Sequence, residues 1–84
     1  MKNKVIVKII VPSLDETFDI FLPCNKKIGK TIELIGNYLK GSTDGVFDFN
    51  EHVELYNRDT GEIYDPNMLV KNTNIRNGSE LILI

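Results

Sequence analysis

Residues 26 to 40, KKIGKTIELIGNYLK, carry apolar side chains at the spacing of an amphipathic helix. Placed at about 100° per residue, the aliphatic side chains fall on one stripe and most of the charged ones on the opposite side. The stripe consists of Ile28, Ile32, Ile35 and Leu39. We expect Asn25 to cap the start of this helix and Gly41 to end it in the left-handed conformation. It is the one helix that the pattern predicts, and its apolar stripe must cover a sheet.

Most of the remaining chain alternates apolar and polar residues with the period of a β-strand. Residues 4–11 and 17–22 alternate in this way on either side of the turn-forming residues 12–16, which predicts a β-hairpin. Further strands are expected at residues 52–57, 62–64 and 80–84, and a short helical turn from Pro66 to Val70. In the loop after the helix, Val46, Phe47 and Phe49 are expected to lie under an edge of the sheet.

The order hairpin, helix, strand, short strand, strand restricts the topology. A crossover through a helix between parallel strands is right-handed. The economical arrangement is one mixed sheet of four to five strands, with the first and last strands parallel at its centre and the helix packed across one face. This is the α+β architecture called β-grasp, and 84 residues suffice for one domain of this kind, residues 1–84. The helix stripe is expected to meet Val5, Val7, Ile9, Phe18, Ile20, Val53, Leu55, Leu81 and Leu83.

Composition and charge narrow the classes of function. Ten basic and twelve acidic residues give a formal charge of −2, whereas a nucleic-acid-binding protein normally has a basic excess. No stretch approaches the roughly 20 apolar residues that a membrane-spanning helix needs, and Lys8 breaks the apolar run near the N-terminus. A single cysteine allows no internal disulfide and is typical of a reducing compartment. We therefore expect a cytoplasmic protein with no nucleic-acid partner and no membrane insertion.

Side chains that carry out catalysis or bind metals are few. Cys24 precedes the predicted helix and His52 begins a predicted strand, but no third residue completes a catalytic set with them. We interpret them as a small buried thiol and a surface imidazole. One cysteine and one histidine make neither a zinc site nor an iron–sulfur site, and Gly29 and Gly36 match no phosphate-binding loop but allow a loop backbone to approach closely. The sequence thus predicts no catalytic residue, no metal site and no cofactor.

The face of the predicted sheet that the helix leaves open carries several large apolar side chains. By strand parity these are Ile6, Ile10, Phe21, Tyr56, Ile82 and Ile84. Apolar side chains gathered into one exposed patch mark a surface that binds a protein. We expect these six residues to bind a partner or a second copy of the chain. The alternative is a scatter of single exposed residues, with a homodimer formed through a sheet edge.

Several segments are similar to those of ubiquitin. The ending NTNIRNGSELIL resembles the short turn and final strand of ubiquitin, and VELYNRDTGE falls at the same place in the order of elements. Nearly the whole chain also resembles the small ubiquitin-like proteins of bacterial type VII (ESX-like) secretion systems, the YukD/EsaB family. The matching segments are FDIFLPCNKKIGKTIELIGNYL, FDFNEHVELYNRDTGEIYDPNMLV and IRNGSELILI. The resemblance implies a ubiquitin-like β-grasp fold and is a match of apolar positions and turns, without a catalytic motif.

One departure from ubiquitin bears on function. Ubiquitin and the sulfur carriers need a flexible tail that ends in Gly-Gly, because the tail enters a narrow enzyme channel. This chain has no Gly-Gly, and Ile84 lies in its last predicted strand. We therefore expect neither conjugation nor sulfur transfer. The positions that match the hydrophobic patch of ubiquitin are near Ile10, Tyr56 and Ile84, and Tyr56 replaces an aliphatic residue there.

The resemblance implies a non-enzymatic ubiquitin-like adaptor or regulatory component of a type VII-like secretion system. Its partner would be a cytosolic domain of a secretion-system membrane component, bound non-covalently through the sheet face. Two alternatives stay open. One is a free-standing ubiquitin-like or Ras-association-like interaction module unrelated to secretion. The other is a relative of sulfur carriers and protein modifiers, which the lack of Gly-Gly disfavours.

Overall fold

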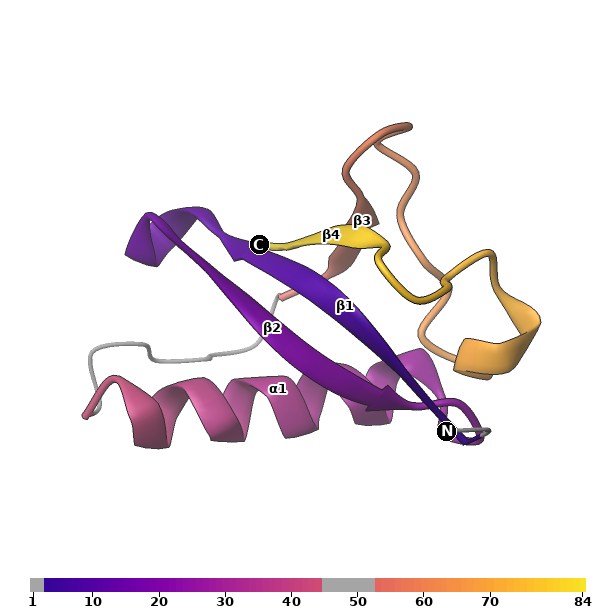
Figure 1. Ribbon diagram of the computed structural model, residues 1–84, viewed down its shortest axis with the longest axis horizontal. Coiled ribbons are helices and arrows are strands. Elements are labelled where there is room, and N and C mark those ends of the chain that lie inside the picture. The colour runs from indigo at the N-terminus through magenta and orange to yellow at the C-terminus, as the bar shows by residue number, and fades with distance from the viewer. Residues whose placement is uncertain (1–2, 45–52) are drawn as a thin grey trace.

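The computed structural model describes residues 3–44 and 53–84, which form one mixed sheet with an α-helix across its face (Figure 1). The strands are β1 (Lys4–Val11), β2 (Glu16–Pro23), β3 (Leu55–Asn57) and β4 (Glu80–Leu83), and the helix is α1 (Ile28–Ser42). Their order across the sheet is β2-β1-β4-β3, with β1 and β4 parallel at the centre and both outer pairs antiparallel. The predicted ubiquitin-like β-grasp fold is confirmed, with four strands.

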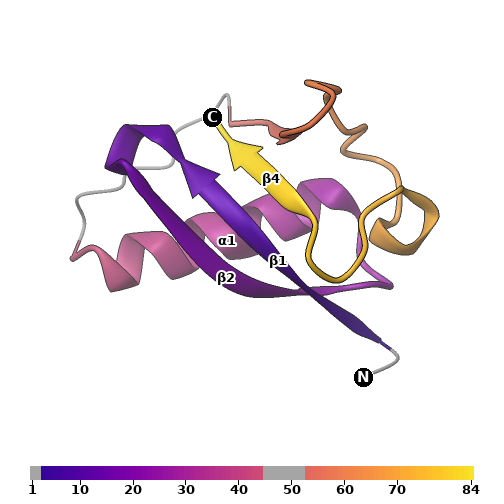
Figure 2. The same ribbon diagram turned by 45° about the horizontal axis from the view of Figure 1, so that its top comes forward.

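The core lies between the sheet and the apolar stripe of α1, which crosses behind β1, β2 and β4 (Figure 2). The central strands contribute alternate residues and the helix contributes its stripe. The buried members are Val7, Ile9, Val11, Ile28, Ile32, Ile35, Leu39, Leu81 and Leu83. Each fully buried aliphatic side chain stabilises the fold by roughly 1.5–3 kcal/mol. This layer therefore fixes which face of each strand points toward solvent.

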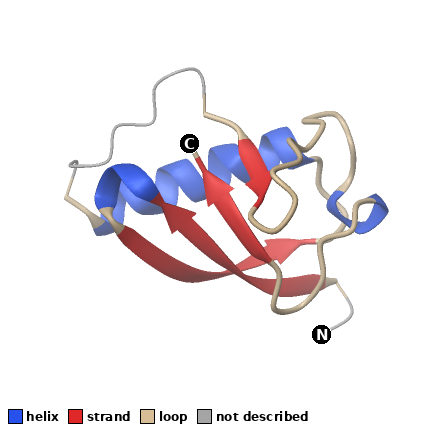
Figure 3. Ribbon diagram, turned by 90° about the horizontal axis from the view of Figure 1, so that it is seen from above, coloured by secondary structure: helices blue, strands red, loops and turns tan. Residues whose placement is uncertain are grey.

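A short 3-10 helix, η1 (Pro12–Leu14), joins β1 to β2, and a second one, η2 (Val70–Asn72), lies at the opposite end of the molecule (Figure 3). Pro12 suits the start of η1 because the N–H that proline lacks would have no partner there. Asp15 then turns the chain in the left-handed conformation, with φ of 53°. The second strand of the hairpin extends one residue further at each end than predicted and includes Pro23.

The start of α1 differs from the prediction. The helix begins at Ile28, two residues later than expected, and neither Asn25 nor any other side chain caps it. Backbone carbonyls of a distant loop replace the cap: Ile28 N–H donates to Met68 C=O and Gly29 N–H donates to Pro66 C=O, both at 2.9 Å. A Cβ on Gly29 would lie 3.2 Å from the Pro66 oxygen. The expected close approach of a loop backbone at Gly29 is thus confirmed.

The end of α1 also differs. The helix continues through Gly41 to Ser42, so the left-handed ending predicted at Gly41 is wrong. Thr43 closes the helix instead, because its N–H and its hydroxyl both donate to Leu39 C=O, at 2.9 and 2.6 Å. The left-handed residue that follows is Asp44, with φ of 57°.

Strands in the C-terminal half are shorter than the alternation predicts. β3 begins at Leu55 and β4 ends at Leu83. Residues 62–64 form no strand and make a single antiparallel bridge, between Ile63 and Tyr56. The predictions for Val46, Phe47, Phe49 and His52 fall outside the described residues.

The helical turn predicted for Pro66–Val70 is displaced. A β-turn forms first, in which Met68 N–H donates to Asp65 C=O at 3.1 Å. Leu69 then forms a bridge with Lys27 at the entry to α1, and this bridge needs extended backbone. The helical turn therefore begins only with η2.

Candidate functional site

The apolar side chains predicted to bind a partner lie on the sheet face opposite α1. They are Ile6, Ile10, Phe21, Tyr56, Ile82 and Ile84. Three of them are largely exposed, with exposed fractions of 39% for Ile6, 58% for Phe21 and 60% for Ile84. The other three are half-buried. The structure therefore brings all six onto one surface, and their role in binding stays a prediction.

A row of charged side chains crosses this surface. Lys8 and Asp19 form an ion pair of 3.2 Å across β1 and β2, and Arg58 and Glu80 form one of 3.3 Å beside β4. Lys8 stands opposite Glu80 in the parallel register of β1 and β4. Along β1, Lys8 is two residues from Ile6 on one side and two residues from Ile10 on the other. Along β4, Glu80 is two residues from Ile82. The single patch expected from parity is therefore divided in two.

The two resulting groups differ in size. The hairpin cluster consists of Ile6 and Phe21, which face each other across β1 and β2. The central cluster consists of Ile10, Tyr56, Ile82 and Ile84, with Ile82 between Ile10 and Tyr56 in the register. Exposed ion pairs stabilise a fold by only about 0.2–1 kcal/mol. The charged row between the clusters is better suited to selecting a partner of complementary charge.

Cys24 contributes to the fold through its backbone. It is half-buried just past the end of β2. Its N–H donates to Asn3 C=O at 2.8 Å, and its C=O accepts from Lys71 N–H at 2.9 Å. Cys24 thus ties the segment before β1 to the loop around η2. His52, the other residue considered for catalysis, lies outside the described residues.

Tyr64 is a buried polar residue that the sequence pattern did not single out. Its hydroxyl donates to Asn74 Oδ1 at 2.7 Å and accepts from Asn57 Nδ2 at 3.0 Å. Burial raises the pKa of the Tyr64 hydroxyl; the hydrogen bond from Asn57 lowers it and nearby Glu62 raises it. The network fastens the loop after β3 to the loop after η2. No local pattern reveals it, because its three members lie at the end of β3, in the loop after β3 and in the loop after η2.

The described residues include no group of three or more histidine, cysteine, aspartate and glutamate side chains placed to bind a metal ion. Within the same part of the chain, no helix combines the length and the apolar character needed to cross a bilayer.

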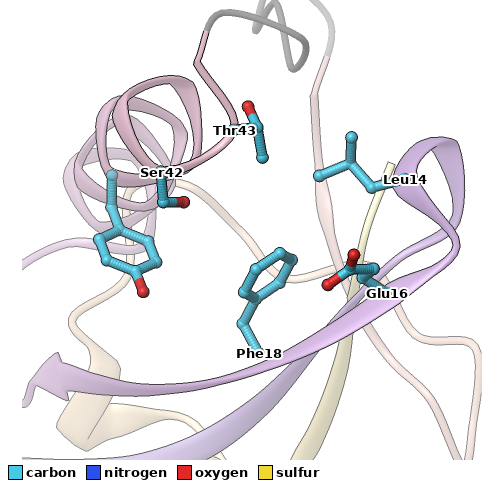
Figure 4. A pocket seen from close by; sticks show the side chains of 6 residues that line it. Leu14, Glu16, Phe18, Ser42 and Thr43 are labelled. Atoms are coloured by element: carbon cyan, nitrogen blue, oxygen red, sulfur yellow. The ribbon is translucent and has the colours of Figure 1, made fainter.

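A hollow of about 390 Å³ lies between the hairpin and the end of α1. Figure 4 shows its lining residues Leu14, Glu16, Phe18, Ser42 and Thr43. Tyr38 closes one side, its ring edge-to-face with Phe18 at a centroid distance of 6.5 Å. Among the described lining residues there is one carboxylate and no histidine, cysteine or lysine. These groups form none of the usual pairs of a nucleophile and a histidine or lysine base.

No protein-family model matches this sequence, and no curated protein matches it. Solved structures match it in fold. The EccD5 ubiquitin-like domain from Mycobacterium xenopi is 16% identical, with a TM-score of 0.71, over 96% of this chain and 92% of that one. The ubiquitin-like domain of the Mycobacterium tuberculosis type VII secretion system protein ECCD1 is 14% identical, with a TM-score of 0.63, over 96% and 97%. The N-terminal ubiquitin-like domain of the 4931431F19Rik protein is 18% identical, with a TM-score of 0.75, over 98% and 74%. These likenesses establish the ubiquitin-like fold.

Proposed function

We propose that this protein is a non-enzymatic ubiquitin-like adaptor or regulatory component of a type VII-like protein secretion system. Its fold, shared with ubiquitin-like domains of type VII secretion proteins, supports this role. So does the resemblance of its segments to the YukD/EsaB family. The observation that carries the proposal is the outer sheet face, where two apolar clusters flank a charged row.

The partner that suits this role is a cytosolic domain of a membrane component of the secretion machinery. We place the protein in the cytoplasm, without a nucleic-acid partner and without insertion into the membrane. Its near-balanced charge favours a protein partner over nucleic acid. Binding is non-covalent, because the proposed contact is made by side chains of a sheet face.

The central cluster supplies the anchor for such binding. Tyr56 lies beside Ile82 in the register of β3 and β4. Tyrosine is enriched at protein interfaces and at the few positions that dominate their energy. Lys8 and Glu80 lie beside the cluster. A partner that places a positive charge against Lys8 or a negative charge against Glu80 is repelled. Affinity would thus come from the apolar clusters and selectivity from the charged row.

Replacing Tyr56 by alanine should weaken partner binding about tenfold or more, because loss of a central aromatic anchor costs about 1.4 kcal/mol or more. Isothermal titration calorimetry with the purified cytosolic domain of the secretion-system membrane component from the same genome measures this. Met68→Ala is the matched control, since Met68 is 41% exposed in the loop that contacts the start of α1. Undiminished binding by a folded Tyr56→Ala variant would exclude the outer face.

A second candidate is a ubiquitin-like interaction module unrelated to secretion. It is favoured by the equally good match in fold to a ubiquitin-like domain whose name carries no link to secretion. The same titration separates the two candidates. If the folded wild-type protein fails to bind the secretion domain, this second candidate is preferred.

A further inference from the structure

One long edge of β2 is open, because β2 is an outer strand of the sheet. An antiparallel ladder alternates hydrogen-bonded and non-bonded pairs, and Cys24 N–H donates to Asn3 C=O at 2.8 Å. Counting in steps of two from this bond, the even-numbered residues of β2 turn their backbone groups toward β1. The N–H and C=O groups of Thr17, Asp19 and Phe21 therefore point away from the sheet. Within the described residues they have no hydrogen-bond partner.

The other outer strand, β3, is covered. Asn57 N–H donates to Glu62 C=O at 2.8 Å, and Tyr64 N–H donates to Leu55 C=O at 3.0 Å. The loop that follows β3 thus occupies its outer edge. Proteins shield outer strands in such ways because an open edge pairs readily with another chain. In the described part of the chain β2 has no such cover.

A groove of about 190 Å³ runs between this open edge and α1. Ile20, Thr31 and Ile35 line it, and Leu34 and Tyr38 form its outer rim, 43% and 54% exposed. An apolar cavity of about 150 Å³ accommodates a benzene-sized molecule, so this groove suits a large aliphatic side chain. A strand paired with the open edge would direct every second side chain into the groove.

Thr31 gives an independent indication of a ligand. Its side chain is 0% exposed, and its hydroxyl has no hydrogen-bond partner within the described residues. Buried hydroxyl groups are nearly always hydrogen-bonded, and an unpaired one destabilises the folded state. Thr31 belongs to the wall of the groove, so a peptide that moves aside the side chains covering its hydroxyl can supply the missing partner.

We propose that the open edge of β2 and this groove bind an extended segment of another protein by strand addition. The charges at the two ends of the groove indicate its composition. Lys27 precedes Thr31 by one helical turn, and Glu16 begins β2 at the other end, whereas Lys30 is already paired with Glu33 at 2.8 Å. The segment has apolar side chains at alternate positions, an acidic residue toward Lys27 and a basic residue toward Glu16.

A second copy of this chain is a poorer occupant. Two β2 strands paired antiparallel about their middle would place Asp19 opposite Asp19, and like charges directly opposite each other destabilise a sheet. β2 also has no basic residue to stand near Glu16. The groove lies on the helix side of the sheet and shares Phe21 with the hairpin cluster, whereas the central cluster lies entirely on the other side. Peptide binding in the groove therefore does not depend on the function proposed for the outer face.

The test uses the whole chain and two synthetic eight-residue peptides. Each peptide alternates isoleucine and serine, with aspartate at one end and lysine at the other, and the two differ in which end carries the aspartate. In a nitrogen-15 NMR titration, one peptide should shift the amide signals of Thr17, Asp19, Phe21 and Thr31. Its dissociation constant should be below about 1 mM, the weak end of specific recognition.

Two variants test the contributions of the groove and of the strand edge to peptide binding separately. Leu34→Asp puts a charge on the exposed rim, and Phe21→Pro removes an outward N–H from an outer strand, where proline is tolerated. Each should weaken peptide binding at least tenfold, whereas Met68→Asp, a similarly exposed control, should bind like the wild type. If Phe21→Pro fails to fold, the peptide affinity of the Leu34→Asp variant alone tests the proposal.

Four results would overturn the proposal. One is a wild-type affinity in the folded Leu34→Asp variant, and another is a set of shifts confined to the central cluster. The third is no binding of either peptide up to about 1 mM. The fourth is a dimer in sedimentation that Phe21→Pro dissociates, which would make a second copy of the chain the occupant.

Discussion

Tyr64 joins two loops through one hydroxyl, which lies between Asn57 and Asn74. Tyr64→Phe removes both hydrogen bonds and leaves the two amide side chains without this partner. We expect it to lower the free energy of unfolding by about 1–2 kcal/mol. Urea denaturation measures the change. Tyr38→Phe is the control, because Tyr38 is 54% exposed. An equal effect of both variants would show that the hydrogen bonds of Tyr64 do not contribute to the free energy of unfolding.

The same hydroxyl makes stability depend on pH in the alkaline range. Burial raises the pKa of Tyr64 above its ordinary value of 10.0, so the folded protein holds this proton more tightly than the unfolded chain. The resulting stabilisation is fully present below pH 10.0 and is lost as the pH rises through the folded-state pKa. Urea denaturation from about pH 9 to 11 should show a steeper loss for the wild type than for Tyr64→Phe. Parallel pH profiles would contradict this assignment.

At the scale of elements, the start of α1 depends on a glycine. A Cβ on Gly29 would lie 3.2 Å from the backbone oxygen of Pro66, in the loop that accepts the first helix N–H groups. Gly29→Ala should therefore lower the free energy of unfolding by about 1–3 kcal/mol, although alanine is the better helix former. Gly41→Ala is the matched control, because no atom of the described residues would lie within 4 Å of a Cβ added there. It should be neutral or stabilise by up to about 1 kcal/mol, as measured by urea denaturation. A Gly29→Ala protein as stable as the wild type would mean that the loop can move aside freely.

The type of each main element followed from local periodicity, whereas several element ends did not. The aliphatic stripe of α1 and the alternation in β1 and β2 are properties of neighbouring residues. The start of α1 is set by carbonyls of Pro66 and Met68, far along the chain. Likewise, residues 62–64 alternate like a strand, but they pair with β3 through a single bridge, between Ile63 and Tyr56. Contacts between distant segments decided these ends.

In the candidate site, too, neighbouring residues predicted one part and contacts between distant segments decided the other. Strand parity placed Ile6, Phe21 and the central cluster on one face, because parity needs only the position of each strand. The charged row was not predicted, because the approach of Lys8 to Glu80 depends on the register of β1 against β4 and not only on their parallel pairing. The open edge of β2 also needs the strand order, which no single segment encodes.

At the scale of the whole molecule, the number of layers explains why the two proposed binding surfaces are open to solvent. One helix covers one face of the four-stranded sheet, so the opposite face meets solvent, and one outer strand stays open beside the helix (Figure 2). The outer face and the groove beside β2 lie on opposite sides of the sheet. If both proposals hold, the chain can bind two proteins at once.

Isoleucine methyl NMR tests the role of the outer face most directly, because isoleucines occupy the outer face, the core and the helix side of the sheet. The chain is titrated with the cytosolic domain of the secretion-system membrane component. We expect the methyl signals of Ile10, Ile82 and Ile84 to shift, while those of buried Ile35 and of half-buried Ile20, on the helix side of β2, stay in place. Shifts at Ile20 without shifts on the outer face, or no shifts at saturating concentration, would contradict the proposed function.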